Sequence, residues 1–500
     1  MGPQAAYDFV VIGAGSAGCA VSGGLADAGA GTIAVVEAGP SDAHPFVKIP
    51  FALIWLMGSR RDWKFMSAPQ KALGGRQIKI PRGKMVGGSG SINSMVWFRG
   101  RADDFDGWGV DGWSWQDVEP AFEAVESHLT PTAFASPHPS VRKLAGLFGA
   151  NSPTNPTPER ESGGVFRFNM RRGRRWSAAD AFLRPNLDKG ITLLTGREVA
   201  RIGFDGKTAR DVHLTDGTTL RARKGIILSA GAIGSPAILL KSGVGPAADL
   251  AEQGVQVIHD APGVGANLHD HPGTGLHFTG RGSGYGLTFR QALAWLTAPF
   301  AYLFGRKGRL ASPTVEGGMF FDATGTDGRP TVQSHFIPFF MNWRGSRYAR
   351  GEGFFADVCL CRPKSRGALR LTDSGISIDF NLLSDPADLA TMVAGVKRLR
   401  ELLRMAGISG VEGYPGPDCA TDDEIADYIR THCGTAYHPV GTLAMGEDEA
   451  PVTPRLAVRG VQNLWVADAS VMPHITSANT NAPSMMIGHR AAQFIAKDAA

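Results

Sequence analysis

A glycine-rich turn near the beginning of the chain has the residue spacing of a dinucleotide-binding site. Residues 13–18 read GAGSAG after an apolar run, and Glu37 comes about 20 residues further on. Glycines let the backbone approach a pyrophosphate, a helix amino end attracts its negative charge, and a carboxylate at this distance accepts a ribose hydroxyl. We therefore predict a dinucleotide site here, rather than a glycine turn between packed elements. FAD and NAD share this geometry, so the pattern does not choose between them.

A second segment rich in small residues points to one family. Residues 82–100 read RGKMVGGSGSINSMVWFRG, and such glycines and serines can place backbone N–H groups beside a phosphate or a flavin. This segment and residues 231–245 (GAIGSPAILLKSGVG) are similar to the two signatures of the glucose–methanol–choline (GMC) oxidoreductases. Further stretches that resemble this family are spread over nearly the whole chain, at residues 112–126, 264–271, 363–367, 435–442 and 466–488.

The resemblance implies a fold and a division into domains. The expected fold is α/β, with an FAD-binding, Rossmann-like domain interleaved with a substrate domain built on an antiparallel sheet. We expect the FAD-binding domain to comprise residues 1–155, 190–265 and 430–500. The substrate domain would then comprise residues 156–189 and 266–429.

The resemblance also assigns residues to the cofactor, position by position. Some members tether FAD through a histidine before the signature Asn93, where this chain has Ile92, so FAD is expected to be non-covalent. The cofactor-binding residues that the resemblance implies are Gly13, Gly15, Ser16, Ala17, Gly18 and Glu37 for the ADP half, Val199 for the adenine, Trp63, Gly88, Asn93 and Met95 near the flavin or pyrophosphate, and Asp468, Ala469 and Thr480 for the remainder.

Two polar residues near the C-terminus match the catalytic pair of the family. His438, in the stretch AYHP, stands at the position of the base, and a neutral imidazole is suited to taking the proton of an alcohol. The second position is His or Asn in the family, and Asn479 and Asn481 compete for it. Counting back from the following helix gives Asn479, whereas counting forward from His438 favours Asn481. We prefer Asn479, because loops change length more readily than helices.

The resemblance implies FAD-dependent oxidation of a primary alcohol to the aldehyde, by proton abstraction and hydride transfer to the flavin. The aromatic residues Phe336, Phe339, Phe340 and Trp343 provide either an apolar slot or ordinary core packing. A slot would favour an aryl or heteroaryl carbinol, the substrate of a pyridoxine 4-oxidase-like member. The alternatives are a choline-type or aliphatic alcohol dehydrogenase with a non-oxygen acceptor, and a hydroxynitrile lyase with structural FAD. Oxygen or another electron acceptor would complete the oxidase or dehydrogenase cycle.

Hydrophobic periodicity predicts the elements that must position these residues. A strand, the glycine turn, a helix and a second strand form a βαβ unit, which requires a parallel sheet. Aromatic and β-branched runs in residues 331–380 predict an antiparallel sheet, and an amphipathic helix is expected after Asp385, which can cap it. The other predicted strands are 8–12, 32–36 and 463–466, and the other predicted helices are 16–28 and 478–495.

The composition bounds the partners and the location of the protein. Hydrophobic residues make up 43% and charged residues 19%, with a net charge of +5, and the five cysteines form no C-x-x-C pair. We therefore expect no metal, no disulfide framework and no nucleic acid, and a small-molecule alcohol as partner. No signal-peptide pattern is present and the longest apolar stretch, Ala294–Phe304, is too short to span a bilayer, so we expect a cytoplasmic enzyme without an integral membrane segment. The basic run 167–175 is either a solvated loop or a rim that attracts anions. The oligomeric state is not indicated.

Overall fold

The main sheet of the protein carries the glycine turn at the end of its central strand. The computed structural model describes residues 5–149, 155–325, 328–340 and 351–499. Seven strands form this sheet in the order β10–β2–β1–β13–β12–β11, and β25 pairs with β13. The pairs β11–β12 and β12–β13 are antiparallel, and all other neighbouring strands pair parallel. The strands are β1 (Ala5–Ile12), β2 (Ile33–Glu37), β10 (Ile191–Thr195), β11 (Val199–Asp205), β12 (Thr208–Leu214), β13 (Thr219–Leu228) and β25 (Leu464–Val466).

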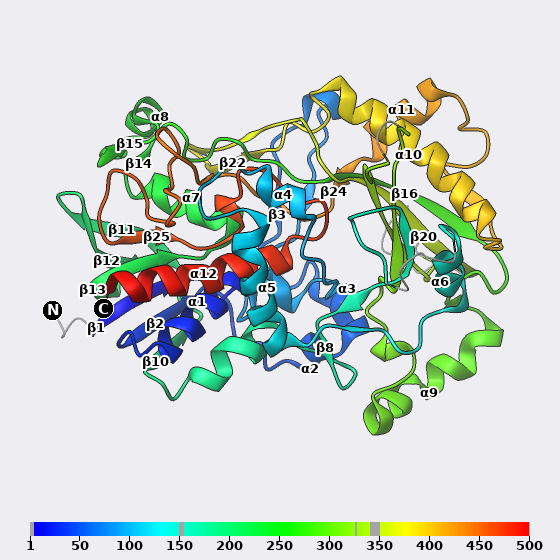
Figure 1. Ribbon diagram of the computed structural model, residues 1–500, viewed down its shortest axis with the longest axis horizontal. Helices are drawn as coiled ribbons and strands as arrows, with labels where there is room; N and C mark the ends of the chain where they lie inside the picture. Colours follow the sequence, from blue (N-terminus) through cyan, green and yellow to red (C-terminus); the bar gives the residue numbers. More distant parts are fainter. Residues whose placement is uncertain (1–4, 150–154, 326–327, 341–350, 500) are drawn as a thin grey trace.

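Two helices from opposite ends of the chain lie side by side (Figure 1). α1 (Ser16–Asp27) follows the glycine turn, and α12 (Asn481–Ala499) comes at the end of the described chain. Their close approach depends on Gly488, because a Cβ there would overlap the backbone of Ala17. α5 (Trp115–Leu129) packs against α12 in turn. Residues 9–12 of β1 are fully buried, as expected for a parallel strand within a covered sheet.

An eight-stranded antiparallel sheet forms the second half of the molecule. Its strands follow the order β23–β16–β20–β19–β18–β6, with β17 beside β20 and β24 beside β16. α10 (Pro386–Met405) packs against β19 and β20, and Asp385 caps it by accepting a hydrogen bond from Ala387 N at 2.9 Å. The strands are β6 (Ser162–Val165), β16 (Pro272–Thr279), β17 (Gly286–Leu287), β18 (Gly317–Phe321), β19 (Val332–Ile337), β20 (Gly351–Leu360), β23 (Val411–Tyr414) and β24 (Gly434–Thr435). The predicted fold class is confirmed.

The predicted elements are confirmed with small shifts at their ends, apart from one helix start. β1, α1, β2 and β25 each begin and end within three residues of prediction, and α10 begins directly after Asp385, as predicted. The helix predicted over 478–495 begins only at Asn481, and residues 478–480 form a loop and turn. Pro483 then lies in the first helical turn, where its missing N–H leaves no helical hydrogen bond unmade. The loop that remains outside the helix contains Asn479.

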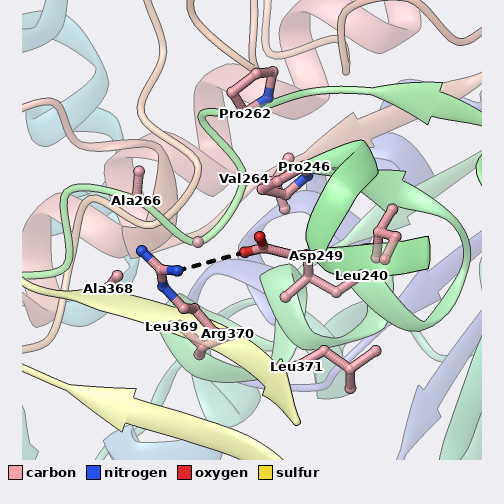
Figure 2. A pocket seen from close by; sticks show the side chains of 12 residues that line it. Leu240, Pro246, Asp249, Pro262, Val264, Ala266, Ala368, Leu369, Arg370 and Leu371 are labelled. Carbon is pink, nitrogen blue, oxygen red and sulfur yellow. Dashed lines mark ion pairs between the residues drawn. The ribbon is translucent and has the colours of Figure 1, made fainter. Parts of the chain in front are cut away.

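A separate hairpin packs against two helices. β21 (Ala368–Thr372) and β22 (Gly375–Asp379) pair with each other, and β21 packs against α7 (Gly231–Lys241) and α8 (Ala247–Glu252). Figure 2 shows the cavity of about 60 Å³ between them, where Arg370 Nη1 lies 3.7 Å from Asp249 Oδ2. A cavity of this size holds a few water molecules, and neither His438 nor Asn479 lines it. The candidate site lies elsewhere.

The remaining elements are short, except for two helices. No helix in the part of the chain that the structure describes is long and apolar enough to cross a bilayer. These elements are α2 (Pro45–Lys48), α3 (Leu53–Leu56), α4 (Ala102–Asp106), α6 (Pro139–Lys143), the longer α9 (Phe289–Gly305) and α11 (Asp422–His432), and the strand pairs β3–β4 (Phe65–Met66, Lys79–Ile80), β5–β7 (Thr132–Ala133, Arg167–Phe168), β8–β9 (Met170–Arg171, Arg174–Arg175) and β14–β15 (Val244–Gly245, His259–Asp260).

Candidate active site

The glycine turn between β1 and α1 is open on one side. Packing requires Gly13 (φ +100°) and Gly18, because a Cβ on either would overlap the backbone of Ser229 or of Gly13. A Cβ on Gly15, by contrast, would meet nothing closer than Ser229 O at 3.8 Å. Gly15 is also the N-cap of α1 and has no side chain to cap it, so the first amide groups of the helix are available to an anion. This cradle fits a pyrophosphate.

The second small-residue segment packs directly on this turn. A Cβ on Gly88 would lie 2.8 Å from Gly15 Cα, so only glycine permits this approach. Close to the same segment, Ser16 Oγ donates to Asn481 Oδ1 at 2.6 Å. Residues from two motifs and from the C-terminal helix therefore form one surface, and Asn481 belongs to it.

Glu37, at the end of β2, stabilises the glycine turn. Its Oε2 accepts from Ala14 N at 3.0 Å and its Oε1 from Gly39 N at 2.8 Å. Burial raises the pKa of Glu37 to about 7, although both hydrogen bonds oppose the rise. A carboxylate has about four acceptor positions, so it can also receive a ribose hydroxyl. Arg197 N donates to Glu37 O at 2.9 Å, which brings the start of β11, with Val199, to the same edge.

Asp468 follows β25 at the same edge of the sheet. Its Oδ2 accepts from Ser235 Oγ at 2.5 Å and from Gly231 N at 2.9 Å, so the carboxylate holds the amino end of α7. Burial raises the pKa of Asp468, against the effect of these donors. Ala469 begins the next turn, and its carbonyl accepts from Gly441 N at 3.4 Å, in the loop that carries His438. Asp468 thus links the sheet edge, α7 and that loop.

A buried arginine holds the residues that are predicted to approach the flavin. Arg175 donates to Asn93 O at 2.7 Å and to Asn93 Oδ1 at 2.8 Å, and only 1% of Arg175 is exposed. Asn93 Oδ1 also accepts from Met95 N at 2.9 Å, and Met95 has a φ of +60°, which is unusual outside glycine. Burial lowers the pKa of Arg175 to about 9. The solvated-loop interpretation of the basic run is therefore wrong for Arg175. The sequence could not reveal this, because nothing in a run of arginines indicates which one is buried.

Trp63 and Thr480 contact the protein scaffold. Trp63 stacks on Phe65 with ring centroids 5.6 Å apart, and Lys84 Nζ lies 4.0 Å from its ring centroid. The carbonyl of Thr480 accepts from Ser484 N at 3.1 Å in the first turn of α12. The predicted roles of both residues toward FAD stay predictions.

His438 and Asn479 come together from two loops. His438 Nε2 lies 3.1 Å from Asn479 Nδ2. Both carboxylate oxygens of Asp270 accept from His438 N at 2.9 Å, and the preceding Tyr437 has a φ of +66°. Asn481 instead contacts the glycine turn. The geometry therefore favours Asn479 over Asn481 as the partner of His438.

A chain of hydrogen bonds sets which nitrogen of His438 carries the proton. His271 Nε2 lies 3.0 Å from Thr476 O, and because a carbonyl can only accept, this nitrogen carries a proton. The other nitrogen of His271 is then an acceptor and lies 3.1 Å from His438 Nδ1, which must donate. His438 Nε2 is then unprotonated, and its lone pair accepts a hydrogen bond from Asn479 Nδ2. This is the arrangement that a base requires.

Burial and neighbouring positive charges keep the two histidines of this hydrogen-bond chain neutral. Burial lowers the pKa of His438 well below its ordinary value, and the neighbouring His271, His335 and Arg82 lower it further. Burial likewise lowers the pKa of His271 to about 4. Both imidazoles are therefore uncharged at neutral pH, each with one N–H, as the hydrogen-bond chain requires.

The antiparallel sheet contributes polar groups opposite this pair. His335, on β19, donates from its backbone N to Asp357 Oδ1 at 2.6 Å, and its Nδ1 lies 3.1 Å from Asp357 Oδ2. Its Nε2 lies 3.5 Å from Asn479 Nδ2, and Gln333 Nε2 donates to Asn479 Oδ1 at 3.0 Å. Burial alone would lower the pKa of His335, but the charge and hydrogen bond of Asp357 raise it on balance. The sequence analysis missed all three residues.

Apolar side chains adjoin these polar groups. One buried cluster includes Met95, Phe166 and Ala478, and the ring of Phe166 lies edge-on to that of His335 with centroids 6.1 Å apart. Phe336 does not contribute to a slot. It alternates with His335 along β19 and stacks on Phe354 at 4.7 Å in the main core, so the core interpretation is correct for Phe336.

The other predicted aromatic residues lie further along the chain. Phe339 packs edge-on against Phe51 and Trp295, with ring centroids 5.7 Å and 5.9 Å away. Phe340 lies against Gly351 and Gly353 of β20. Trp343 lies outside the described residues. An aromatic group therefore does form, but with partners that lie far away in the sequence.

Known proteins resemble this chain over nearly its whole length. Residues 7–273 and 363–488 match the two parts of the GMC oxidoreductase family profile. An alcohol dehydrogenase [acceptor] of Pseudomonas putida is 36% identical over 98% of this chain and 96% of its own. An oxygen-dependent choline dehydrogenase of Sinorhizobium medicae is 36% identical over 98% and 95%. The solved structure of pyridoxine 4-oxidase from Mesorbium loti has a TM-score of 0.84 at 26% identity, covering 97% of this chain and 98% of its own.

These similarities agree with the geometry of the site. The open cradle at Gly15 suits the pyrophosphate of FAD, the cofactor of the family, and a neutral His438 beside Asn479 suits the deprotonation of an alcohol. The chain therefore belongs to the GMC oxidoreductase family of FAD-dependent enzymes, whose members include alcohol and choline dehydrogenases.

Proposed function

We propose that this enzyme oxidises a primary alcohol to the aldehyde, with His438 as the base and Asn479 as its partner. The observation that carries the proposal is the chain from Thr476 O through His271 to His438, which leaves Nε2 unprotonated at 3.1 Å from the Asn479 amide. A substrate hydroxyl that approaches both groups would give its proton to Nε2 and accept a hydrogen bond from the amide. When bound, FAD supplies the acceptor for the carbinol hydride.

His335 would stabilise the negative charge that develops on the substrate oxygen. An imidazole with a low pKa is a weak base, so proton transfer to His438 needs such stabilisation. His335 Nε2 faces the Asn479 amide at 3.5 Å, and Asp357 favours the protonated form of His335. Asn479 itself cannot act as a base, because an amide side chain does not take up a proton at neutral pH.

The substrate class that we propose is an aryl or heteroaryl carbinol. The polar groups adjoin the apolar cluster that contains Met95, Phe166 and Ala478. Asp357 is already engaged by His335, so its carboxylate is not free to pair with a quaternary ammonium. The similarity to the pyridoxine 4-oxidase, at 26% identity, supports a heteroaryl substrate.

A second candidate function is the dehydrogenation of a choline-type or aliphatic alcohol with an acceptor other than oxygen. The relative named alcohol dehydrogenase [acceptor], at 36% identity, favours this candidate. Small Ala436, two residues before His438, instead favours access of oxygen. A hydroxynitrile lyase, in which FAD is only structural, is the third alternative.

Anaerobic mixing of the FAD-loaded enzyme with pyridoxine, benzyl alcohol, 1-octanol, choline and glucose separates these functions. We expect the flavin absorbance to bleach fastest with the first two alcohols. Faster bleaching with choline or glucose contradicts the proposed substrate class, and bleaching by none of the alcohols, with cleavage of a cyanohydrin, identifies a lyase. Admission of air then reports on the acceptor: peroxide forms if oxygen reacts, and a dye is required if it does not.

FAD is proposed to be bound without a covalent bond. Ile92 stands at the position of the tethering histidine, and its side chain packs with Val47, Leu56 and Met85. Acid denaturation and centrifugation should therefore release the flavin into the supernatant. Yellow colour that stays with the pellet contradicts the proposal.

A further inference from the structure

A long helix at the rim of the molecule exposes an apolar face. α9 lies at the lower right edge of Figure 1, and its inner side consists of Trp295, Ala298 and Tyr302. The residues on its outer side have exposed fractions between 62% and 98%. These six residues, which we call the apolar face of α9, are Phe289, Leu293, Leu296, Phe300, Leu303 and Phe304. Their spacing of three or four residues places them along one stripe of the helix.

The apolar face is large for a protein surface. Six such side chains present on the order of 700 Å² of apolar area, at roughly 150–250 Å² for each aromatic side chain. The largest apolar patch on a typical monomer is about 300–600 Å², and a larger patch marks an interaction site. The exposed Phe46 and Trp55 of α2 and α3 pack, through the buried Phe51, against Trp295 on the inner side of α9, with ring centroids 5.5–6.2 Å apart.

Positive charge borders the apolar face. Residues 289–307 contain three basic residues and no Asp or Glu. The turn between β8 and β9 packs against the end of α9, because a Cβ on Gly173 would lie 2.7 Å from Arg306 Cβ. The exposed basic residues of this turn and of the end of α9, which we call the basic rim, are Arg171, Arg172, Arg174 and Lys307. The second sequence interpretation of the basic run, a rim that attracts anions, thus has a structural basis.

The basic rim borders a cavity of headgroup size. Its volume is about 330 Å³, and its lining includes the three rim arginines, Lys48 and Arg175. Asp180, also in the lining, accepts from Lys48 Nζ at 2.8 Å and pairs with Arg184, so its charge is already compensated. Tyr302 Oη donates to Lys48 O at 3.2 Å, which fixes α9 beside the cavity. The cavity therefore suits a phosphate group.

We propose that the apolar face of α9 and the basic rim bind the surface of an anionic membrane, with α9 lying in the plane of the interface. An amphipathic helix with exposed Phe and Leu inserts into the headgroup region, and neighbouring Arg and Lys side chains gain from anionic lipids. α9 does not cross the bilayer, because it has 17 residues and contains Pro299 and Arg290. This binding is independent of which alcohol the enzyme oxidises.

A second copy of the chain fits this surface less well. A two-fold dimer through α9 would bring the same patch of both subunits together, with both basic rims at the contact. Neither residues 170–175 nor residues 289–307 contain an acidic residue to pair with them. An anionic bilayer supplies both an apolar interior for the helix face and negative charge for the basic rim, so we infer that a bilayer is the partner of this surface.

Vesicle flotation of the FAD-loaded enzyme tests the proposal. Wild type should float with vesicles of phosphatidylcholine and phosphatidylglycerol, and less with pure phosphatidylcholine or in high salt. Leu296→Glu/Phe300→Glu should lower the partition coefficient at least roughly tenfold. Arg171→Ala/Arg172→Ala should reduce binding to the level seen with phosphatidylcholine alone. The matched control, Met405→Glu/Val411→Glu, charges two apolar residues that are 57% and 70% exposed elsewhere and should float like wild type.

Further measurements keep the test decisive. FAD content and dye-linked activity without vesicles should be unchanged in all variants, which excludes misfolding. Phe300→Trp keeps the face apolar, and its fluorescence should be quenched by brominated phosphatidylglycerol. The proposal is overturned if wild type does not float, if the control loses binding equally, or if Phe300→Trp is not quenched. A wild-type dimer that Leu296→Glu/Phe300→Glu dissociates, without vesicle binding, would assign the face to a second copy instead.

Discussion

The glycine-turn side of the site and the antiparallel-sheet side hold their polar groups in different ways. On the first, backbone meets backbone at Gly15 and Gly88, and the amino end of α1 supplies the attraction for an anion. On the second, Gln333 and His335 reach Asn479 as side chains from β19. A contact between backbones tolerates almost no substitution, whereas side chains on a strand can be exchanged without changing the fold. We therefore expect changes on the first side to affect FAD retention, and changes on the second to affect substrate rates.

His438 lies between the two sides, and its loss should have the largest effect. His438→Ala removes the lone pair that would take the alcohol proton, so anaerobic flavin reduction should slow by roughly 10²–10⁴-fold. FAD should stay bound, because the contacts of His438 are with Asp270, His271 and Asn479 rather than with the glycine turn. Stopped-flow absorbance gives the rate, and the ratio of flavin to protein absorbance gives the FAD content.

His474→Ala is the control for this variant. His474 lies in the same region, but its ring contacts Arg366 instead of the pair. Its replacement should leave the reduction rate within about twofold of wild type, as expected for a change away from the reacting groups. Equal losses in His438→Ala and His474→Ala would mean that the region is merely sensitive, and that His438 is not the base.

Substitution of the two asparagines should have different effects, one on the rate of reduction and the other on FAD retention. Asn479→Ala removes one hydrogen bond to a charged oxygen, about 1.5–3 kcal/mol, so reduction should slow roughly tenfold to a hundredfold with FAD still bound. Asn481→Ala removes the acceptor for Ser16 on the glycine turn, so it should weaken FAD retention and leave the rate of the FAD-saturated enzyme nearly unchanged. If Asn481→Ala instead reduces that rate more than Asn479→Ala, our assignment is wrong and the count forward from His438 was correct.

Local pattern was sufficient to predict the glycine turn and the strands beside it. The residues 13–18 lie in one contiguous turn whose geometry is fixed by its own glycines, and Glu37 follows at the end of the adjacent strand. Even here the side-chain contacts differ from expectation, because the carboxylates of Glu37 and Asp468 accept hydrogen bonds from backbone amides of the protein itself. Arg175 could not be identified, because its burial depends on contacts with Asn93, 82 residues away.

The substrate side could not be predicted at the level of residues. His335 and Asp357 are 22 residues apart and meet only through the pairing of β19 and β20, whose register depends on side chains across the whole sheet. Alternation along a strand puts Gln333 and His335 on one face, but it does not indicate that this face meets Asn479. The same alternation places Phe336 in the core, so a run of aromatic residues was a weaker guide than strand phase.

His271 tests whether the hydrogen-bond chain matters. His271→Phe removes the acceptor for His438 Nδ1–H, and some molecules will then carry the proton on Nε2 instead. The lost hydrogen bond is about 1–1.4 kcal/mol, so reduction should slow roughly fivefold to tenfold. His271 also lowers the pKa of His438, so the rise of rate with pH should move to higher pH, which a purely structural loss would not produce. His271→Gln, whose carbonyl can accept, should restore most of the rate.

The smallest effect at neutral pH is expected from Asp357→Asn, and its signature is a shift rather than a loss. In wild type the pKa of His438 lies well below 6.5 and that of His335 above it, so the working form, with His438 neutral and His335 charged, exists between the two. The pH profile of kcat/KM should therefore rise with His438 and fall as His335 loses its proton. Asparagine removes the charge that favours the imidazolium, and burial then lowers the pKa of His335, so the falling limb should move to lower pH. Activity should be lost severalfold above neutrality and little below it.

Asp249→Asn, which breaks the distant ion pair with Arg370, should leave both limbs in place. A falling limb that does not move in Asp357→Asn would show that the charge of His335 is not used, and that the antiparallel sheet contributes only shape to the site.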